Sequence, residues 1–113
     1  MTIRFPITAI VSILHRLSGV FLFLLIPLFL SVLADSLKTP ENFLSIHHYL
    51  SQPASKLVLL VIFFALFYHM FAGIRHLLMD AGVGEKLTQA RVSAVFTLLA
   101  AVTVTALLGV RLW

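Results

Sequence analysis

Four residues near the middle of the chain place ligand and acid–base chemistry on one face of an apolar segment. His69 is followed by Gly73, His76 and Asp80 at offsets of four, seven and eleven residues. Each residue of an α-helix turns the side chain by about 100°, so this spacing places them in one narrow stripe. Ala65, four residues before His69, adds a small side chain. A neutral imidazole between Ala and Gly is typical of a ligand with room for a flat macrocycle against the backbone.

His69 is predicted to lie at membrane depth, about 9 Å along a helix inside Arg75 and about 20 Å from Lys56. An ionisable group there costs free energy unless it is bonded, which makes it a candidate for function. Three interpretations are open: a haem or metal ligand, a hydrogen bond between helices, or a proton relay. A single histidine cannot complete a six-coordinate haem, so haem ligation would need a second axial group from a partner chain.

Arg75 and His76 lie one to two helical turns closer to the membrane surface than His69. A porphyrin parallel to the helix axis would present its propionates at this level, where cationic donors would stabilise them. Alternatively, Arg75 reaches to the membrane surface and His76 lies at the interface. Asp80 could orient His76 from four residues away, or it could face water.

A second polar group lies near the N-terminus. Ser12 and Arg16 form an i,i+4 donor pair of one hydroxyl and one guanidinium. Such a pair is suited to hold a lipophilic molecule that carries a carbonyl group, such as a quinone head group. His15 and Gly19 share this face at helical spacing, and we expect a short interfacial helix over residues 6–16.

The composition requires lipid as the main solvent for these elements. Of the 113 residues, 61% are hydrophobic and 11% are charged. A soluble domain of this size could not bury so much apolar surface. The absence of Cys excludes disulfides, thiolate metal sites and iron–sulfur clusters within the chain. The net charge of +4 comes without a basic patch interleaved with aromatic residues, so no nucleic-acid partner is expected.

Three uncharged runs have the length of membrane spans. They are residues 17–34, 57–74 and 92–110. Crossing a bilayer takes about 20 residues, and the lack of period-two alternation excludes β-barrel strands. We therefore predict an all-α integral membrane protein, one domain over residues 1–113, in which the short interfacial helix precedes three transmembrane helices. The predicted spans are residues 17–36, 57–79 and 92–112.

Turn and helix signals divide the rest of the chain. Pro27 should kink the first span. In the polar connector, Thr39–Asn42 is typical of a turn and helix start, and Ser51–Pro53 of another break. Adjacent His47 and His48 would point about 100° apart on a helix, so we expect ordinary interfacial residues.

The third span carries no candidate chemistry and is expected to provide packing and lipid-facing surface. Ala81–Gly84 should end the preceding helix. Thr97, Thr103 and Thr105 can bond back to carbonyls of their own helix.

Lys and Arg are more frequent on the side of the N-terminus, and this predicts a cytoplasmic N-terminus. That side has Arg4, Arg16, Arg75, Lys86 and Arg91, whereas the other side has Lys38, Lys56 and Arg111. The opening residues do not fit a cleaved signal peptide, so we expect the first helix to be retained.

Together, the two polar stretches resemble the cytochrome b subunits of succinate dehydrogenase, the larger membrane anchors of respiratory complex II. The family pattern Ser-x-x-His-Arg-x-Ser-Gly matches residues 12–19, and His-x-x-x-Gly-x-Arg-His-x-x-x-Asp matches residues 69–80. The opening residues 4–10 also resemble enterobacterial-type members. The resemblance covers essentially the whole chain.

The resemblance implies a haem b shared between two subunits. His69 would be one axial ligand of the iron, and a small membrane-anchor subunit would supply the other. His15, Arg16, Arg75 and His76 become candidates for the haem-propionate region.

The resemblance also implies a site for ubiquinone as substrate, lined by Ser12 and Arg16 with residues of an iron–sulfur subunit and the small anchor. A flavoprotein subunit would be attached through the iron–sulfur subunit, and the complex would lie in the bacterial inner membrane. This chain alone would carry no catalytic residue of the succinate:quinone oxidoreductase reaction. Such complexes serve electron transport and the tricarboxylic acid cycle.

Other functions remain open at this point. The chain could be the anchor of a quinol:fumarate reductase, because direction depends on redox potentials and quinone type. It could also be a haem-free structural anchor that only docks soluble subunits. A small proton-coupled transporter is disfavoured, because three spans without an internal repeat give no inverted pair.

Overall fold

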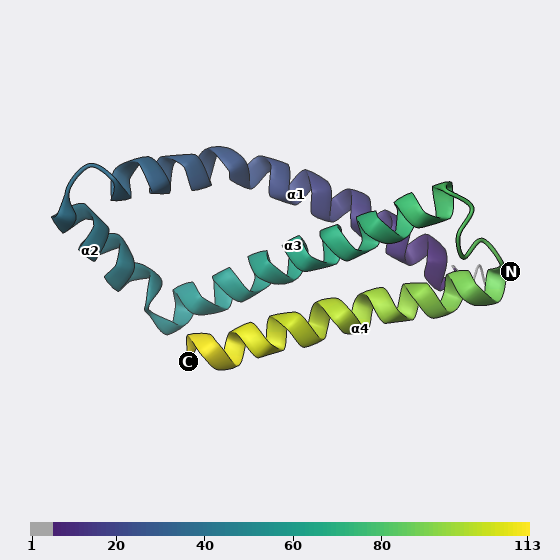
Figure 1. Ribbon diagram of the computed structural model, residues 1–113. Helices are drawn as coiled ribbons and strands as arrows, with labels where there is room; N and C mark the ends of the chain where they lie inside the picture. The colour runs from purple at the N-terminus through teal and green to yellow at the C-terminus, as the bar shows by residue number, and fades with distance from the viewer. Residues whose placement is uncertain (1–5) are drawn as a thin grey trace, which may run out of the picture.

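The computed structural model describes residues 6–113, and the regular secondary structure in that range is entirely helical. The helices are α1 (Ile7–Ser36), α2 (Pro40–Leu50), α3 (Pro53–Asp80) and α4 (Leu87–Leu112). Figure 1 shows α1, α3 and α4 alongside one another, with the short α2 joining α1 to α3 at one end. The three long helices have 30, 28 and 26 residues and are apolar and long enough to cross a membrane. The predicted all-α architecture with three spans is confirmed.

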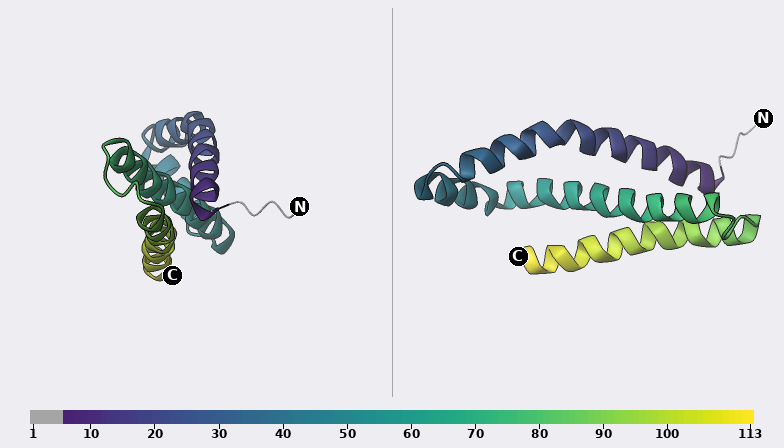
Figure 2. Two further views of the ribbon diagram at one scale, coloured as in Figure 1. Left: turned by 90° about the vertical axis from the view of Figure 1, so that its right-hand side faces the viewer. Right: turned by 45° about the horizontal axis from the view of Figure 1, so that its top comes forward.

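The segment expected as a short interfacial helix forms the first turns of α1. No proline stands between Ile7 and Leu25, so nothing interrupts the helix where the span was expected to begin. A helix of this length extends about 45 Å, whereas the hydrocarbon core is about 30 Å thick. The first turns can therefore lie at the membrane surface without a separate helix. The helix α1 is curved, and in the right-hand view of Figure 2 its middle part is farthest from α3. Pro27 lies in α1, and its missing N–H favours a bend.

The polar connector folds as predicted around two breaks. The Thr39 hydroxyl caps α2 by accepting from the Asn42 amide at 3.1 Å, and Pro40 occupies the first turn. A second proline, Pro53, starts α3. His47 and His48 are exposed on α2, as expected for interfacial residues.

Small side chains bring α4 close to α3. The buried positions of α4 repeat at helical spacing and are Ala90, Ala94, Thr97 and Ala101. Alanine and threonine allow helix backbones to approach closely, which favours association inside a membrane. The hydroxyls of Thr97, Thr103 and Thr105 donate to carbonyls four residues earlier, as predicted. In the view of Figure 1, α3 runs between α1 and α4.

Two glycines turn the chain between α3 and α4. Gly82 and Gly84 have φ values of +85° and +75°. This left-handed region is accessible to glycine without steric cost. The turn therefore ends α3 at the place that the sequence predicts, and it directs the start of α4 back toward the end of α3.

Candidate functional site

Three histidines from two helices form one cluster near the N-terminal end of α1. The ring of His15 on α1 stacks on His69 of α3, with centroids 4.3 Å apart and planes within 12°. The His15 ring also stacks on His76, seven residues further along α3, with centroids 5.0 Å apart and planes within 22°. The structure therefore brings together the histidines of both polar stretches. We call His15, His69 and His76 the histidine stack.

The hydrogen bonds of His69 determine which of its nitrogens carries the proton. His69 Nδ1 lies 3.1 Å from the His15 carbonyl oxygen and 3.1 Å from Ser18 Oγ. The Ser18 hydroxyl donates to the same carbonyl at 2.8 Å. A carbonyl oxygen only accepts, so Nδ1–H is assigned as the donor and Nε2 keeps its lone pair. Through these contacts, residues of α1 orient the ring and leave Nε2 able to bind a metal.

His76 is oriented by its own helix. Its Nδ1 lies 2.7 Å from the carbonyl oxygen of Ala72, one turn earlier. Asp80 is exposed and makes no hydrogen bond to His76 in this structure. By the same reasoning as for His69, the Nε2 of His76 carries the lone pair.

Two glycines make the close approach of α1 and α3 possible. A Cβ added to Gly19 would lie 2.9 Å from His69 Cε1, which is closer than real Cβ contacts come. A Cβ added to Gly73 would lie 3.3 Å from His15 Nε2. In the chain alone, the space beside Gly73 is taken by the imidazole ring of His15, whereas Ala65 lines a cavity. These glycines belong to the two motifs, but the sequence does not show which ring each one faces.

Ser12 and Arg16 lie on α1 beside this cluster and keep their donors available. Arg16 is exposed and Ser12 is half-buried. Neither side chain hydrogen bonds to another residue of the range 6–113. One hydroxyl and one guanidinium thus flank His15 near the N-terminal end of α1. They can grasp an acceptor oxygen that approaches from outside the chain.

Arg75 is on a different face of α3 from the histidine stack. It is 6% exposed and points to α4, where its Nε donates to Ser93 Oγ and its Nη2 to the Ala90 carbonyl, both at 3.0 Å. The structure therefore does not bring Arg75 together with His15 and His76. Its contact with a haem propionate stays a prediction, whereas its observed partners join α3 to α4.

Tyr68 is a polar contact that the motifs do not reveal. Its side chain is 3% exposed and lies in a buried cluster with Val11, Ala94 and Ala101, and its hydroxyl donates to the Val11 carbonyl at 2.6 Å. A buried tyrosine hydroxyl needs a hydrogen-bond partner. The position of Tyr68 in an apolar span is therefore the one feature of the sequence that indicates such a contact. The partner itself depends on how α1 crosses α3.

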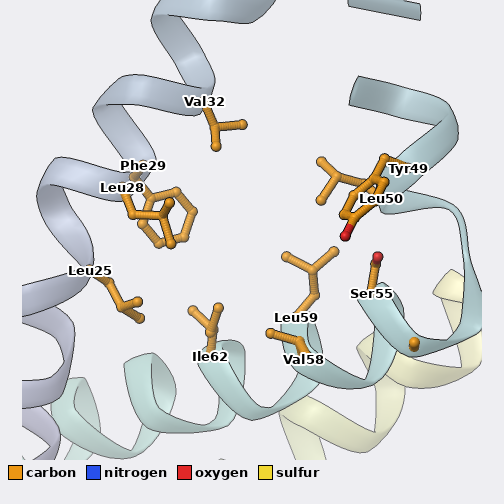
Figure 3. Close-up of a pocket in the computed structure, with 11 residues that line it drawn as sticks. Leu25, Leu28, Phe29, Val32, Tyr49, Leu50, Ser55, Val58, Leu59 and Ile62 are labelled. Carbon is orange, nitrogen blue, oxygen red and sulfur yellow. The ribbon is translucent and has the colours of Figure 1, made fainter. Parts of the chain in front are cut away.

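Two cavities lie between α1 and α3, and only one of them is near the histidine stack. A cavity of about 420 Å³ lies at the α2 end and is lined mainly by Leu, Ile, Val and Phe (Figure 3). Only Tyr49 and Ser55 bring hydroxyls to it, so it offers hydrocarbon contact rather than redox chemistry. The smaller cavity, about 320 Å³, is lined by Ala65, Tyr68 and Ser18 among other residues, and Ser18 also contacts His69 Nδ1.

No group of three or more His, Asp or Glu side chains in the described range could hold a metal ion together. Stacked imidazoles present their faces to one another, so their nitrogens do not converge on one point. The donor chemistry therefore fits a single nitrogen ligand from this chain, completed by another molecule. A haem with one axial histidine per subunit has that requirement.

The chain is similar to proteins of a known family. The family of succinate dehydrogenase/fumarate reductase transmembrane subunits matches residues 1–108. The succinate dehydrogenase cytochrome b556 subunit of Coxiella burnetii is 38% identical over 111 residues, which cover 97% of this chain and 89% of that protein. The cytochrome b556 subunit of Paracoccus denitrificans is 34% identical, with 80% and 70% covered. The chain therefore belongs to the family of succinate dehydrogenase/fumarate reductase transmembrane subunits, as a multi-pass membrane anchor.

Proposed function

We propose that this anchor serves a succinate:ubiquinone oxidoreductase and supplies His69 as one axial ligand of a haem b (heme b). The observation that supports this most directly is the 3.1 Å contact between His69 Nδ1 and the His15 carbonyl, which leaves Nε2 as the ligand atom. The similar proteins of known name are cytochrome b subunits. When bound, haem supplies a one-electron redox centre. The second axial ligand would come from the small membrane-anchor subunit.

The other histidines of the stack are suited to the propionate end of that haem. His15 and His76 lie within 5.0 Å, centroid to centroid, and Arg16 is one residue from His15. Arginine, and histidine in its protonated form, donate charge-assisted hydrogen bonds that stabilise carboxylates strongly where water is scarce. We assign His15, Arg16 and His76 to this region, and Arg75 only if it exchanges its contacts with α4.

The quinone would bind beside Ser12 and Arg16. Their donors have no partner within the described chain and lie near the membrane surface, where an amphipathic head group rests. Hydrogen bonds aimed at the quinone oxygen stabilise the negative charge that develops as it is reduced. Electrons would arrive from succinate through the flavoprotein and iron–sulfur subunits. We place the complex in a bacterial inner membrane with the N-terminus in the cytoplasm, so protons would come from that side.

The test uses the co-expressed complex with two variants, His69→Ala and Arg16→Ala. We expect His69→Ala to abolish or shift the reduced b-type absorption band, since Nε2 is removed. Arg16→Ala should lower succinate:quinone activity by about tenfold or more, the size of a lost charge-assisted hydrogen bond. Its succinate oxidation by an artificial soluble acceptor should be unchanged.

Arg91→Ala is the matched control, because Arg91 is also exposed and lies at the start of α4. An unaltered spectrum in His69→Ala would contradict the ligand assignment. Equal loss of both activities in Arg16→Ala would mean that Arg16 only holds the complex together.

A haem-free structural anchor is the alternative that a specific contact supports. The hydrogen bonds of His69 to α1 could also serve only to join two helices inside the membrane. A purified complex without any b-type absorption would favour that function. The family also includes fumarate reductase subunits. Comparing the rates of succinate oxidation by quinone and of fumarate reduction by quinol would determine the physiological direction.

A further inference from the structure

The hydroxyl of Tyr68 makes a contact between α3 and α1 that has no role in the function proposed so far. It donates to the Val11 carbonyl at 2.6 Å from a ring that is 3% exposed. Val11 is itself fully buried and directly precedes Ser12. The contact therefore acts on the backbone of the helical turn that carries a proposed quinone donor.

Tyr68 and its neighbour His69 hold two successive turns of α1. The Tyr68 hydroxyl binds the Val11 carbonyl, and His69 Nδ1 binds the His15 carbonyl four residues later. Carbonyls at i and i+4 lie on the same side of a helix, about 6 Å apart along its axis. Both carbonyls lie off the axis of α1, so rotation of α1 about its axis would stretch both hydrogen bonds, and each of them opposes it.

The rotation of α1 decides where its donors point. Ser12 follows Val11 directly, and Arg16 follows His15 directly. Rotating α1 would swing both side chains together, whereas its position along α3 would change little. Tyr68 shares one buried cluster with Ala94 and Ala101 of α4, a helix that carries no site residue, and this packing supports the side chain that carries the hydroxyl.

We propose that Tyr68 is a positioning residue of the quinone site: its hydroxyl sets the rotation of α1, and with it the direction of Ser12 and Arg16. The proposal rests on the proposed function of that pair. Tyr68 itself does not touch the quinone. Its hydroxyl acts through the Val11 carbonyl, while its ring fills the junction of three helices.

The decisive variant is Tyr68→Phe, which removes the hydroxyl and keeps the ring. Tyr49→Phe is the matched control, since Tyr49 is the other tyrosine of the chain and is 66% exposed on α2. We expect Tyr68→Phe in the intact complex to raise KM for a soluble ubiquinone analogue about threefold to tenfold, as for one lost neutral hydrogen bond. Its kcat, its succinate oxidation with an artificial acceptor and its haem absorption should match those of Tyr49→Phe.

Each other outcome overturns the inference. An unchanged quinone KM would show that the hydroxyl does not position the donors. Parallel loss of all activities would show a purely structural role, and a shifted haem band with unchanged KM would show an effect on His69 alone. Arg16→Ala, measured in parallel, separates this inference from the proposed function. If Arg16→Ala leaves quinone kinetics unchanged, the proposed site itself fails; if it alters them while Tyr68→Phe does not, only the role of Tyr68 fails.

Discussion

The side chain of His69 is constrained from several directions by α1. Its Nδ1 contacts the His15 carbonyl and Ser18 Oγ, its face stacks on the His15 ring, and its Cε1 lies against Gly19. A metal ligand held in this way loses little freedom on binding, because its tautomer and ring plane are set beforehand. The α1 motif therefore helps to orient the ligand that we propose.

Enlarging Gly19 should disturb this arrangement directly. In Gly19→Ala the new Cβ would lie 2.9 Å from His69 Cε1, so the ring or the helix must move. We expect a lower haem content or a shifted b-type band in the purified complex. The control is Gly109→Ala, whose Cβ would meet Leu60 at an ordinary 3.6 Å. A normal spectrum in Gly19→Ala would mean that His69 leaves α1 when the complex assembles.

At the scale of the elements, α3 has two polar faces with different partners. One face presents His69 and His76 to α1, and the other buries Arg75 against α4. Adjacent residues on a helix point about 100° apart, so Arg75 and His76 can be neighbours in sequence and still belong to different interfaces. The central helix thereby links the proposed redox site to a supporting helix that carries no site residue.

Replacing Arg75 should lower the stability of the complex and leave its redox chemistry unchanged. Arg75→Gln removes the bonds to Ser93 and Ala90, and hydrogen bonds to charged groups contribute about 1.5–3 kcal/mol. We expect a lower thermal midpoint of the complex and an unchanged haem reduction potential, with exposed Arg91→Gln as the control. A shifted potential with normal stability would instead support the predicted contact of Arg75 with a propionate.

The whole molecule has a small buried core and a broad apolar surface. Its buried apolar side chains gather mainly around Tyr68, while large side chains such as Phe23, Phe96 and Leu107 are more than half exposed. Exposed apolar surface on this scale marks contact with lipid or with partner proteins. The two ends of the molecule differ. The histidine stack and the α3–α4 turn lie at one end, and at the other end Lys56 Nζ lies 5.3 Å from the ring centroid of Trp113.

The orientation of the chain follows from charges at these two ends. Five Lys or Arg on the N-terminal side against three on the other predict a cytoplasmic N-terminus, although Arg4 lies outside the described residues. Three spans then place Trp113 on the opposite side. An alkaline phosphatase fused after Trp113 should be active, and one inserted between α3 and α4 should be inactive. The reverse pattern would contradict the orientation and the proton source proposed for the quinone.

Much of the candidate site was predictable from local spacing. The i,i+7 pair His69 and His76 and the i,i+4 pair Ser12 and Arg16 share helix faces wherever the helices lie. The side chains that cross between helices were not predictable in the same way. The hydrogen bonds of Ser18 with His69 and of Tyr68 with Val11 join residues more than fifty positions apart. Nothing in the local sequence specifies such a pair.

The sequence by itself determined the number of spans, the breaks at Thr39–Asn42 and Ser51–Pro53, and which polar residues share a helix face. These follow from hydrophobic run length and helical period, which are properties of each segment alone. Only the tertiary structure decided that His15 stacks between His69 and His76, that Arg75 turns to α4, and that α1 is one continuous helix. The physical reason is that the rotation of one helix against another is set by which small residues allow contact, and that is a joint property of two surfaces.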